Sequence, residues 1–288
     1  NQDARLQNDQ IQNMVLQGAD VLIVVAQDGQ AAVTAVDAAA REGIPVIAYD
    51  RLIPSPNLAA YLSFDNVAVG EAQAEGVTAV QDSGRFVLLG GSPVDNNARL
   101  FRKGQMNVLQ PLIDAGDIQV VADQWVENWD PNNALNLMEN ILTAQNNNVD
   151  AVVASNDGTA LGALQALSAQ GLEGEVPISG QDATLAGCKS IVEGELTVTV
   201  FKDVRKLSPA AMDMAIQLAQ GEEVSGLQDF TLAELTLDDS LEGSVPCRFL
   251  PVVKVTEDNV YEEVILTGFQ PYDEVYANVP EDERPPRP

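Results

Sequence analysis

Short apolar runs alternate with amphipathic helical segments along most of this 288-residue chain. Five of the apolar runs end abruptly in carboxylates, amides or a charged pair, and a helical pattern follows. These junctions lie at 46–51, 86–97, 120–129, 151–158 and 176–183. Apolar, β-branched runs bounded in this way are typical of buried parallel strands in right-handed βαβ units. The pattern therefore predicts an α/β fold.

The strand and helix patterns repeat about every 30 residues, which is the spacing of consecutive βαβ units. We expect strands at 19–26, 46–50, 61–66, 85–91, 118–126, 150–157, 176–182 and 196–202, and helices at 3–17, 31–43, 70–82, 98–116, 131–146, 159–171, 184–194 and 208–221. Farther along, 231–239, 245–256 and 261–269 alternate like extended strands. So many units fit two lobes better than one small sheet.

Polar residues gather where the expected strands end, and ligands of open α/β sheets bind beyond those carboxyl ends. The residues at these ends are Asp50, Arg51, Asp95, Asn96, Asn97, Asn156, Asp157, Gln181, Asp182 and Lys202. Amides, carboxylates and a guanidinium pair well with hydroxyl groups, which both donate and accept hydrogen bonds. The row predicts a polar, uncharged ligand, and a sugar fits that description.

Each of these residues also has a purely structural interpretation. The residues at 95–97, 156–157 and 181–182 stand where helix N-caps are expected. Asp50 and Arg51 also fit an ordinary ion pair, and Lys202 fits a surface lysine with its stem on apolar surface. Trp129 follows a strand end between polar neighbours, so it is placed either to stack on the C–H face of a sugar or to pack in the core.

The charge balance narrows the range of partners. There are 43 acidic and 15 basic residues, which give a net charge of −28. This charge repels nucleic acid, whose binding needs a basic patch, and it is typical of a solvated acidic surface. The carboxylates are scattered rather than set at the spacing of a metal-binding loop, so we expect no metal site.

The chain contains no histidine. This excludes histidine-based catalytic triads and most zinc and iron sites. The sequence matches neither the dinucleotide nor the P-loop glycine motif, so we expect no cofactor. The two cysteines, Cys188 and Cys247, fit either one disulfide or two buried thiols.

Six strings lie at or next to the expected strand ends: AYDRLI, SFDN, GGSPVDNNARLFRKGQM, DQWVENW, VVASNDGTA and ISGQDA. These strings resemble the ribose- and galactose-type periplasmic binding proteins of bacterial ABC sugar importers, above all their xylose-binding branch. The resemblance implies two Rossmann-like lobes with parallel sheets flanked by helices, joined by a three-crossover hinge, with a pentose enclosed between the lobes. It also implies delivery of the sugar to an ABC permease, and no enzymatic activity. The matching positions imply sugar hydrogen bonds from Asp50, Arg51, Asp95 or Asn97, Asn156, Asp182 and Lys202, with Trp129 stacking on the ring.

The resemblance also sets expectations for domains and location. The first lobe would comprise 1–94 and 204–243, and the second 95–203 and 244–278, followed by a charged, proline-rich tail at 279–288 that we expect to be disordered. In this family a strand, a helix and a strand precede the position of Asn1, so we expect that segment to be missing. The gap would be covered either by a rearranged first lobe or by surface from another chain in a homo-oligomer. We expect a periplasmic or extracellular protein, with a lipidated N-terminal anchor as one option. In an oxidising compartment, an even number of cysteines favours a Cys188–Cys247 disulfide.

Two other functions compete with the receptor. A sugar-active enzyme would use paired carboxylates such as Asp50 and Asp182, as in glycoside hydrolysis. The sensory lobe of a LacI-type repressor shares the architecture, but such proteins carry a basic helix-turn-helix, and this acidic chain has none. The receptor remains the leading hypothesis.

Overall fold

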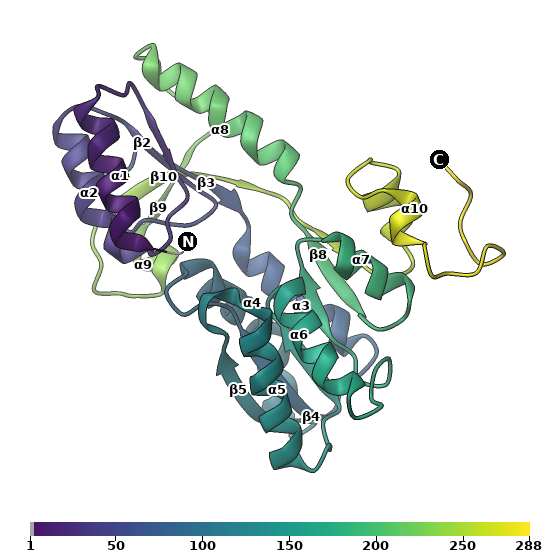
Figure 1. Cartoon of the computed structure of the whole chain (residues 1–288). Coiled ribbons are helices and arrows are strands. Elements are labelled where there is room, and N and C mark those ends of the chain that lie inside the picture. Colours follow the sequence, from purple (N-terminus) through teal and green to yellow (C-terminus); the bar gives the residue numbers. More distant parts are fainter. Residues whose placement is uncertain (1–2) are drawn as a thin grey trace. The chain divides into compact units, whose positions relative to one another are not determined.

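The computed structural model describes residues 3–288 and confirms an α/β fold with parallel sheets flanked by helices (Figure 1). The strands are β1 (Leu22–Val24), β2 (Val46–Tyr49), β3 (Ala60–Phe64), β4 (Gly84–Gly90), β5 (Ile118–Trp125), β6 (Ala151–Ala154), β7 (Ser179–Gln181), β8 (Val198–Phe201), β9 (Gln228–Thr231), β10 (Ser244–Leu250) and β11 (Val253–Val255). The helices are α1 (Ala4–Leu16), α2 (Gly29–Arg41), α3 (Asn66–Thr78), α4 (Asn96–Ala115), α5 (Pro131–Gln145), α6 (Asp157–Ser168), α7 (Leu185–Val192), α8 (Val204–Ala219), α9 (Leu232–Thr236) and α10 (Tyr272–Val275). A 3₁₀ turn, η1 (Glu127–Trp129), and a π turn, η2 (Tyr261–Ile265), complete the set.

The chain divides into two compact units. Unit 1 contains the chain up to Asn66 together with Val94–Leu100 and Asp203–Pro251, and unit 2 contains Val67–Pro93, Phe101–Lys202 and Val252–Pro288. These bounds differ from the expected lobes, because 67–93 belongs to unit 2 and both 95–100 and 244–251 belong to unit 1. The chain passes from one unit to the other after residues 66, 202 and 251. It also enters unit 1 briefly at residues 94–100, between two segments of unit 2.

Unit 1 is built on a five-stranded sheet in the order β1-β2-β3-β10-β9. The first four strands are parallel, and β9 is antiparallel to β10. Helices α1 and α2 lie side by side (Figure 1). Helix α2 buries Ala32, Ala35, Val36 and Ala39, a spacing of three or four residues that gathers them on one face. This face joins strand residues such as Val46 in the core of unit 1.

Unit 2 holds two three-stranded sheets, β5-β4-β6 and β11-β8-β7. A parallel bridge between Val152 and Ile178 connects them, so β6 and β7 are neighbours. All pairs except β11 with β8 are parallel. The carboxyl ends of β4, β6, β7 and β8 therefore meet at one edge, which is where ligands of such sheets bind.

Two segments expected to be extended are instead helical. Residues 232–236 form α9, because Thr231 and Glu234 make a capping box in which each side chain binds the other residue's backbone N–H. Residues 261–265 form the π turn η2, which helps to bury Val264 and Ile265. The third segment, 245–256, is extended as expected and forms β10 and β11 on either side of Pro251.

The tail at 279–288 makes specific contacts in this structure, in contrast to the expected disorder. The hydroxyl groups of Tyr261 and Tyr272 donate hydrogen bonds to the carbonyls of Pro286 and Pro285, each at 2.6 Å. Arg284 is also held close to the chain, since its Nε donates to a backbone carbonyl at 2.7 Å. Proline lacks an N–H but keeps its carbonyl acceptor, so a proline-rich end can still be fixed by tyrosine donors.

The expected Cys188–Cys247 disulfide is not formed, and both thiols are free and buried. Cys188 belongs to the core of unit 2, and Cys247 belongs to the core of unit 1. Each thiol donates a weak hydrogen bond to a nearby carbonyl, Cys188 to Ala183 and Cys247 to Val245. Burial raises the pKa of each thiol to about 12, so both behave as small apolar core residues. The even cysteine count misled the prediction.

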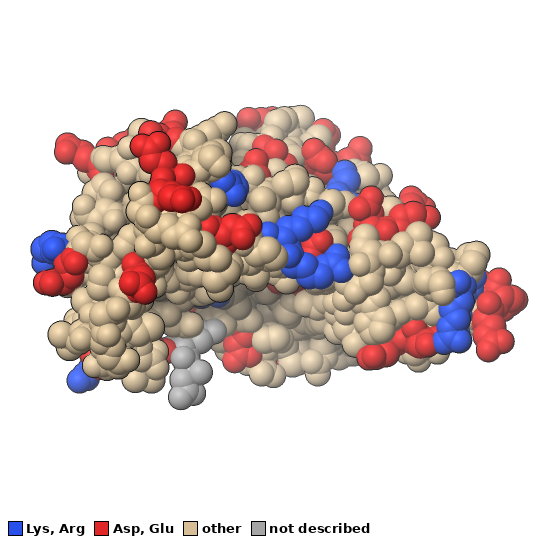
Figure 2. Space-filling model, turned by 90° about the horizontal axis from the view of Figure 1, so that it is seen from above, with Lys and Arg blue, Asp and Glu red and all other residues tan. Residues whose placement is uncertain are grey.

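Acidic side chains are spread over the face of the molecule shown in Figure 2 and are separated by uncharged residues. This matches a solvated acidic surface rather than one concentrated patch. Among residues 3–288, no helix combines the length and the apolar character that crossing a membrane requires.

Candidate functional site

The carbonyl of Asp50 is the centre of a polar cluster in unit 1. It accepts hydrogen bonds from the Tyr61 hydroxyl at 3.0 Å, the Ser63 hydroxyl at 2.8 Å and the Asn97 amide at 3.1 Å. Asp50 follows β2 in a left-handed conformation with φ of 60°, which aspartate tolerates better than most residues. Three donors on one carbonyl fix the backbone where the strand ends. They therefore also fix the position of the Asp50 Cβ, from which the carboxylate extends.

Arg51 and Asp95 form an ion pair in the same cluster. Arg51 Nε lies 3.0 Å from Asp95 Oδ2, and the Asp95 side chain is only 3% exposed. The other oxygen of Asp95 accepts the backbone N–H of Asn97 at 3.0 Å. Asp95 thus holds the guanidinium of Arg51 and the start of α4 together. An ion pair, which the sequence offered as the alternative for Arg51, is therefore present, and Asp95 supplies its carboxylate.

Asn97 is the most enclosed of the four expected residues in unit 1, with 2% of its surface exposed. Its Oδ1 accepts hydrogen bonds from the Asn66 amide at 2.9 Å and from the Tyr61 hydroxyl at 3.3 Å, while its Nδ2 binds the Asp50 carbonyl. Both ends of the amide therefore contact protein. The structure brings Asp50, Arg51, Asp95 and Asn97 into one network.

In unit 2, Trp129 and Lys202 share a neighbour, Phe101. The Trp129 and Phe101 rings meet edge to face with centroids 6.3 Å apart, and Lys202 Nζ lies 5.7 Å from the Phe101 centroid. Trp129 ends the η1 turn, where Asn128 and Trp129 both have left-handed backbones. A Cβ on Gly91 would come within 1.8 Å of the Trp129 ring, so only glycine leaves room for this ring position.

Asn156, Asp182 and Lys202 follow the neighbouring strands β6, β7 and β8. The Asn156 side chain accepts the Thr159 N–H at 2.9 Å, so it is the N-cap of α6, as its structural interpretation predicted. The Asp182 N–H donates to the Val200 carbonyl at 2.9 Å, which extends the β7–β8 pairing past the strand end. Lys202 is 6% exposed. The structure thus places Asn156, Asp182 and Lys202 at one edge of the sheet. Lys202 also links this edge to the Trp129–Phe101 pair, because it lies over the Phe101 ring.

Asp157, the neighbour of Asn156, is completely buried. Its carboxylate accepts hydrogen bonds from the Thr199 hydroxyl at 2.7 Å and from the Thr184 N–H and hydroxyl at 2.8 Å each. Burial raises the pKa of this carboxyl to about 7, opposed by these hydrogen bonds and assisted by the charge of Asp182. The Asp157 carboxylate therefore contacts protein groups rather than solvent.

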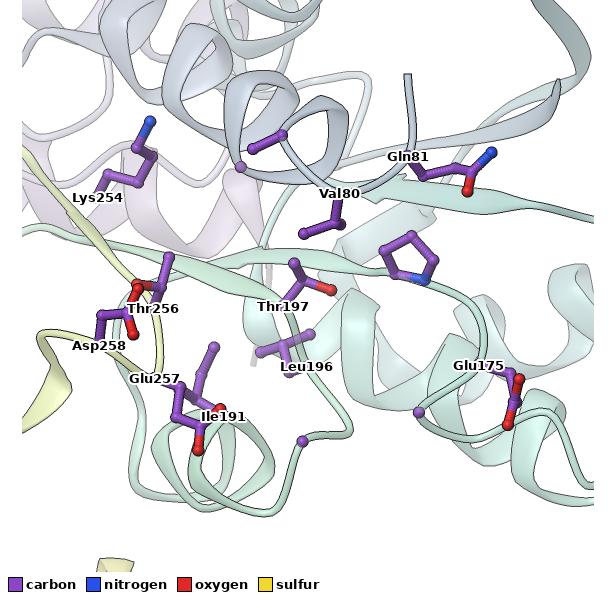
Figure 3. A pocket seen from close by; sticks show the side chains of 15 residues that line it. Val80, Gln81, Glu175, Ile191, Leu196, Thr197, Lys254, Thr256, Glu257 and Asp258 are labelled. Carbon is purple, nitrogen blue, oxygen red and sulfur yellow. The ribbon is translucent and has the colours of Figure 1, made fainter. Parts of the chain in front are cut away.

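A cavity of about 520 Å³ also lies in unit 2, but it is lined by other residues. Pro177, Leu196 and Thr197 border it before β7 and β8 begin, so it lies at the end of these strands opposite to Asp182 and Lys202. Figure 3 shows Val80, Thr197 and Leu196 near the middle of this cavity, with acidic side chains toward its margins. None of the expected site residues lines it.

Sequence reasoning missed several residues that build these networks. Tyr61 and Ser63 lie within an expected strand, and the signal that could have found them is that two polar groups at alternate positions of an apolar strand point to the same face. Gly91 belongs to no glycine motif, so nothing in the sequence indicated that its missing side chain makes room for the Trp129 ring. Phe101 gave no signal, because its neighbours Trp129 and Lys202 are distant in sequence.

A comparison with protein families settles the class of protein. The model of the family described as a periplasmic binding protein domain matches residues 1–223. The chain belongs to the periplasmic binding protein family. The sequence resemblance is confirmed at that level, and so is the type I fold implied by it.

Two relatives of this periplasmic binding protein carry the same name, D-xylose-binding periplasmic protein. The protein from Escherichia coli (strain K12) is 49% identical over 269 residues, which is 93% of this chain and 79% of the relative. The protein from Haemophilus influenzae is 49% identical over 276 residues, 96% of this chain and 81% of the relative. A solved carbohydrate transporter solute binding protein from Chloroflexus aurantiacus, in complex with D-glucose, superposes with a TM-score of 0.84 at 32% identity and covers 95% of this chain and 86% of its own. The hydrolase alternative gains no support from these similarities.

Proposed function

We propose that this periplasmic binding protein is a solute-binding receptor that captures a monosaccharide, with D-xylose as the preferred ligand. The observation that carries the proposal is the 49% identity, over 93% of the chain, to a protein named for binding D-xylose. The polar network in unit 1 and the polar residues that follow β6, β7 and β8 in unit 2 support it. They offer guanidinium, carboxylate, amide and ammonium groups for hydroxyls, and an indole for the apolar face of a sugar ring.

The proposal assigns sugar contacts to residues of both units. In unit 1 these are Asp50, Arg51, Asp95 and Asn97, and in unit 2 they are Trp129, Asn156, Asp182 and Lys202. Because the Asn97 amide and the Asn156 oxygen already bind protein groups, these two side chains must share their hydrogen-bonding capacity between the protein and the sugar. Arg51 is oriented by Asp95, and its planar guanidinium suits two adjacent hydroxyls.

We further propose that the protein works in the periplasm, delivers its sugar to an ABC permease and has no enzymatic activity of its own. Release of product from a xyloside by the purified protein would contradict the last point. The proposal needs no metal, nucleotide or other cofactor.

Tryptophan fluorescence tests the proposal with an internal control, because the chain has two tryptophans, Trp125 and Trp129. Addition of D-xylose is expected to change the emission of the wild-type protein and of Trp125→Phe, whereas Trp129→Phe is expected to show no change. A signal that persists in Trp129→Phe and disappears in Trp125→Phe would remove Trp129 from the site. The absence of any response to every sugar of a pentose and hexose panel, combined with no binding heat, would refute the receptor function.

A further inference from the structure

Asp182, proposed above to contact the sugar, lies in a strained stretch of backbone. Asp182 has φ of 104° and Ala183 has φ of 46°, and neither residue is glycine. Residues that carry a side chain rarely adopt such backbone conformations, and these persist only where the surrounding structure holds them. Ala183 is completely buried, so the contacts that hold this stretch are internal to unit 2.

The strand pairing to Val200 and donors to the Ala183 carbonyl hold part of this stretch. The contacts made by the N–H groups of the two residues after Asp182 converge on the carboxylate of Asp157. The Ala183 N–H donates to the Thr199 hydroxyl at 3.1 Å, and that hydroxyl donates to Asp157 Oδ1 at 2.7 Å. On the other side, the N–H and the hydroxyl of Thr184 both donate to Asp157 Oδ2 at 2.8 Å. The two residues that follow Asp182 are thus tied to one carboxylate, directly or through one hydroxyl.

The space around this carboxylate is closed by glycines. A Cβ on Gly180 would lie 2.2 Å from Asp157 Oδ1, and a Cβ on Gly187 would lie 2.2 Å from Oδ2. Strand β7 and helix α7 therefore approach the carboxylate as closely as a backbone can. Two titratable groups of the described chain interact electrostatically with Asp157: the carboxylate of Asp182, after β7, and the thiol of Cys188, on α7.

The direction of each hydrogen bond shows which protonation state fits this network. The Thr199 hydroxyl accepts the Ala183 N–H, and the Thr184 hydroxyl accepts the Gly187 N–H at 3.0 Å. Each hydroxyl has one proton, and here that proton points to Asp157. With the Thr184 N–H, all three neighbouring groups point a proton at the carboxylate and none of them is left to accept a proton from it, which favours the ionised form.

We propose that ionised Asp157 is a positioning residue for sugar binding, because it holds the strained Asp182–Ala183 backbone in the conformation that presents the Asp182 carboxylate. This role rests on the proposed sugar-binding function and adds a pH dependence to it. Burial raises the pKa of Asp157 to about 7, so the carboxylate takes up a proton as the pH falls through neutrality. The added proton has no acceptor among these groups unless a threonine hydroxyl turns its own proton away.

Calorimetric titration of D-xylose at pH 8 and pH 6 tests this role in four proteins: wild type, Thr199→Val, Asp157→Asn and the control Thr159→Val. Thr159 is also completely buried and lies on α6, but its hydroxyl has no hydrogen-bond partner within the described chain. We expect Thr199→Val to weaken xylose binding about fivefold to tenfold at pH 8, the scale of one lost hydrogen bond. The control is expected to bind within about twofold of wild type, since it loses no such bond.

The pH dependence separates positioning from general stability. Wild-type affinity is expected to fall by up to about tenfold between pH 8 and pH 6, because roughly a tenth of the protein keeps the competent ionised form at pH 6. Asp157→Asn, which cannot ionise, is expected to bind weakly at both pH values. Thermal unfolding of each variant establishes that it is folded, and Thr199→Val decides the matter if Asp157→Asn does not fold.

The outcomes distinguish this inference from the function on which it rests. If wild type binds xylose and Thr199→Val and Thr159→Val both bind equally well, the positioning role is wrong while the receptor function stands. An affinity of wild type that is the same at pH 8 and pH 6 would also overturn the inference. Only the absence of sugar binding by wild type would refute the proposed function itself.

Discussion

The packing of Trp129 against Gly91 allows the position of the indole ring to be perturbed by a substitution at Gly91, with Trp129 itself unchanged. A Cβ at position 91 would lie 1.8 Å from one ring carbon of Trp129 and 2.2 Å from two others. Gly91 is buried, and its backbone is outside the left-handed region where alanine is strained. Gly91→Ala therefore acts through this steric clash alone, and the Trp129 ring must move.

The expected cost follows from the contacts that are lost. Forcing a methyl group into a packed interior costs about 1–3 kcal/mol. Displacing the ring also sacrifices its edge-to-face contact with Phe101, a type of contact worth about 0.5–1.5 kcal/mol. We expect the free energy of unfolding of Gly91→Ala to decrease by about 1.5–4.5 kcal/mol, which is the sum of these two effects. If Trp129 stacks on the sugar, xylose affinity falls as well.

The assay combines urea unfolding with a fluorescence titration of xylose, and Gly158→Ala is the matched control. A Cβ at Gly158, on α6, would meet its nearest neighbour at 3.5 Å, an ordinary contact. Alanine in a helix is favoured over glycine by about 0.5–1 kcal/mol, so this control is expected to be as stable as wild type or slightly more. A Gly91→Ala protein that matches the control in stability and in affinity would refute the assigned ring position.

Three further predictions concern single groups. Asp182→Ala is expected to stay folded and to weaken xylose binding by about 2–4 kcal/mol, the cost of losing a charged hydrogen-bond partner in a buried site; an unchanged dissociation constant would remove Asp182 from the site. Thiol titration of the denatured, unreduced protein is expected to find two free thiols, Cys188 and Cys247, whereas the native protein reacts slowly because both are buried. Burial lifts the pKa of Asp157 from 3.8 to about 7, so its contribution to stability is present below about pH 4 and is lost as the pH rises to about 7, a change of about 4 kcal/mol at 1.36 kcal/mol per pKa unit. In urea unfolding at pH 4 and pH 7, wild type is expected to lose about 3 kcal/mol of stability relative to Asp157→Asn, which is the part of this change that falls between the two pH values, and a constant difference between the two proteins would contradict it.

The parallel strands were predictable because each strand and the helix after it leave a local pattern in the sequence. Apolar runs such as 151–154 end in polar residues and precede amphipathic helices, and the structure has strand β6 and helix α6 there. The same logic identified Asp50, Arg51, Asp182 and Lys202 as residues at strand ends, where the structure has them. What each side chain contacts was not predictable, because the partners are distant in sequence. Arg51 binds Asp95, and Lys202 lies over Phe101.

The errors have specific physical causes. The alternation of 231–239 suggested a strand, but the Thr231–Glu234 capping box, visible in the sequence as T-x-x-E, starts a helix. Counting Cys188 and Cys247 suggested a disulfide, but a disulfide requires Cα atoms within about 7 Å, and a count carries no such distance. The two cysteines belong to the cores of different units.

Isothermal titration calorimetry against a panel of monosaccharides tests the central claim most directly. We expect saturable binding of D-xylose with one site per chain, tighter than binding of ribose, arabinose, glucose or galactose. The same titration with Asp182→Ala ties the heat to the proposed site, because the variant is expected to bind far more weakly. Tight binding of ribose or galactose without xylose would contradict the assignment of xylose, and no heat with any sugar would contradict the receptor function.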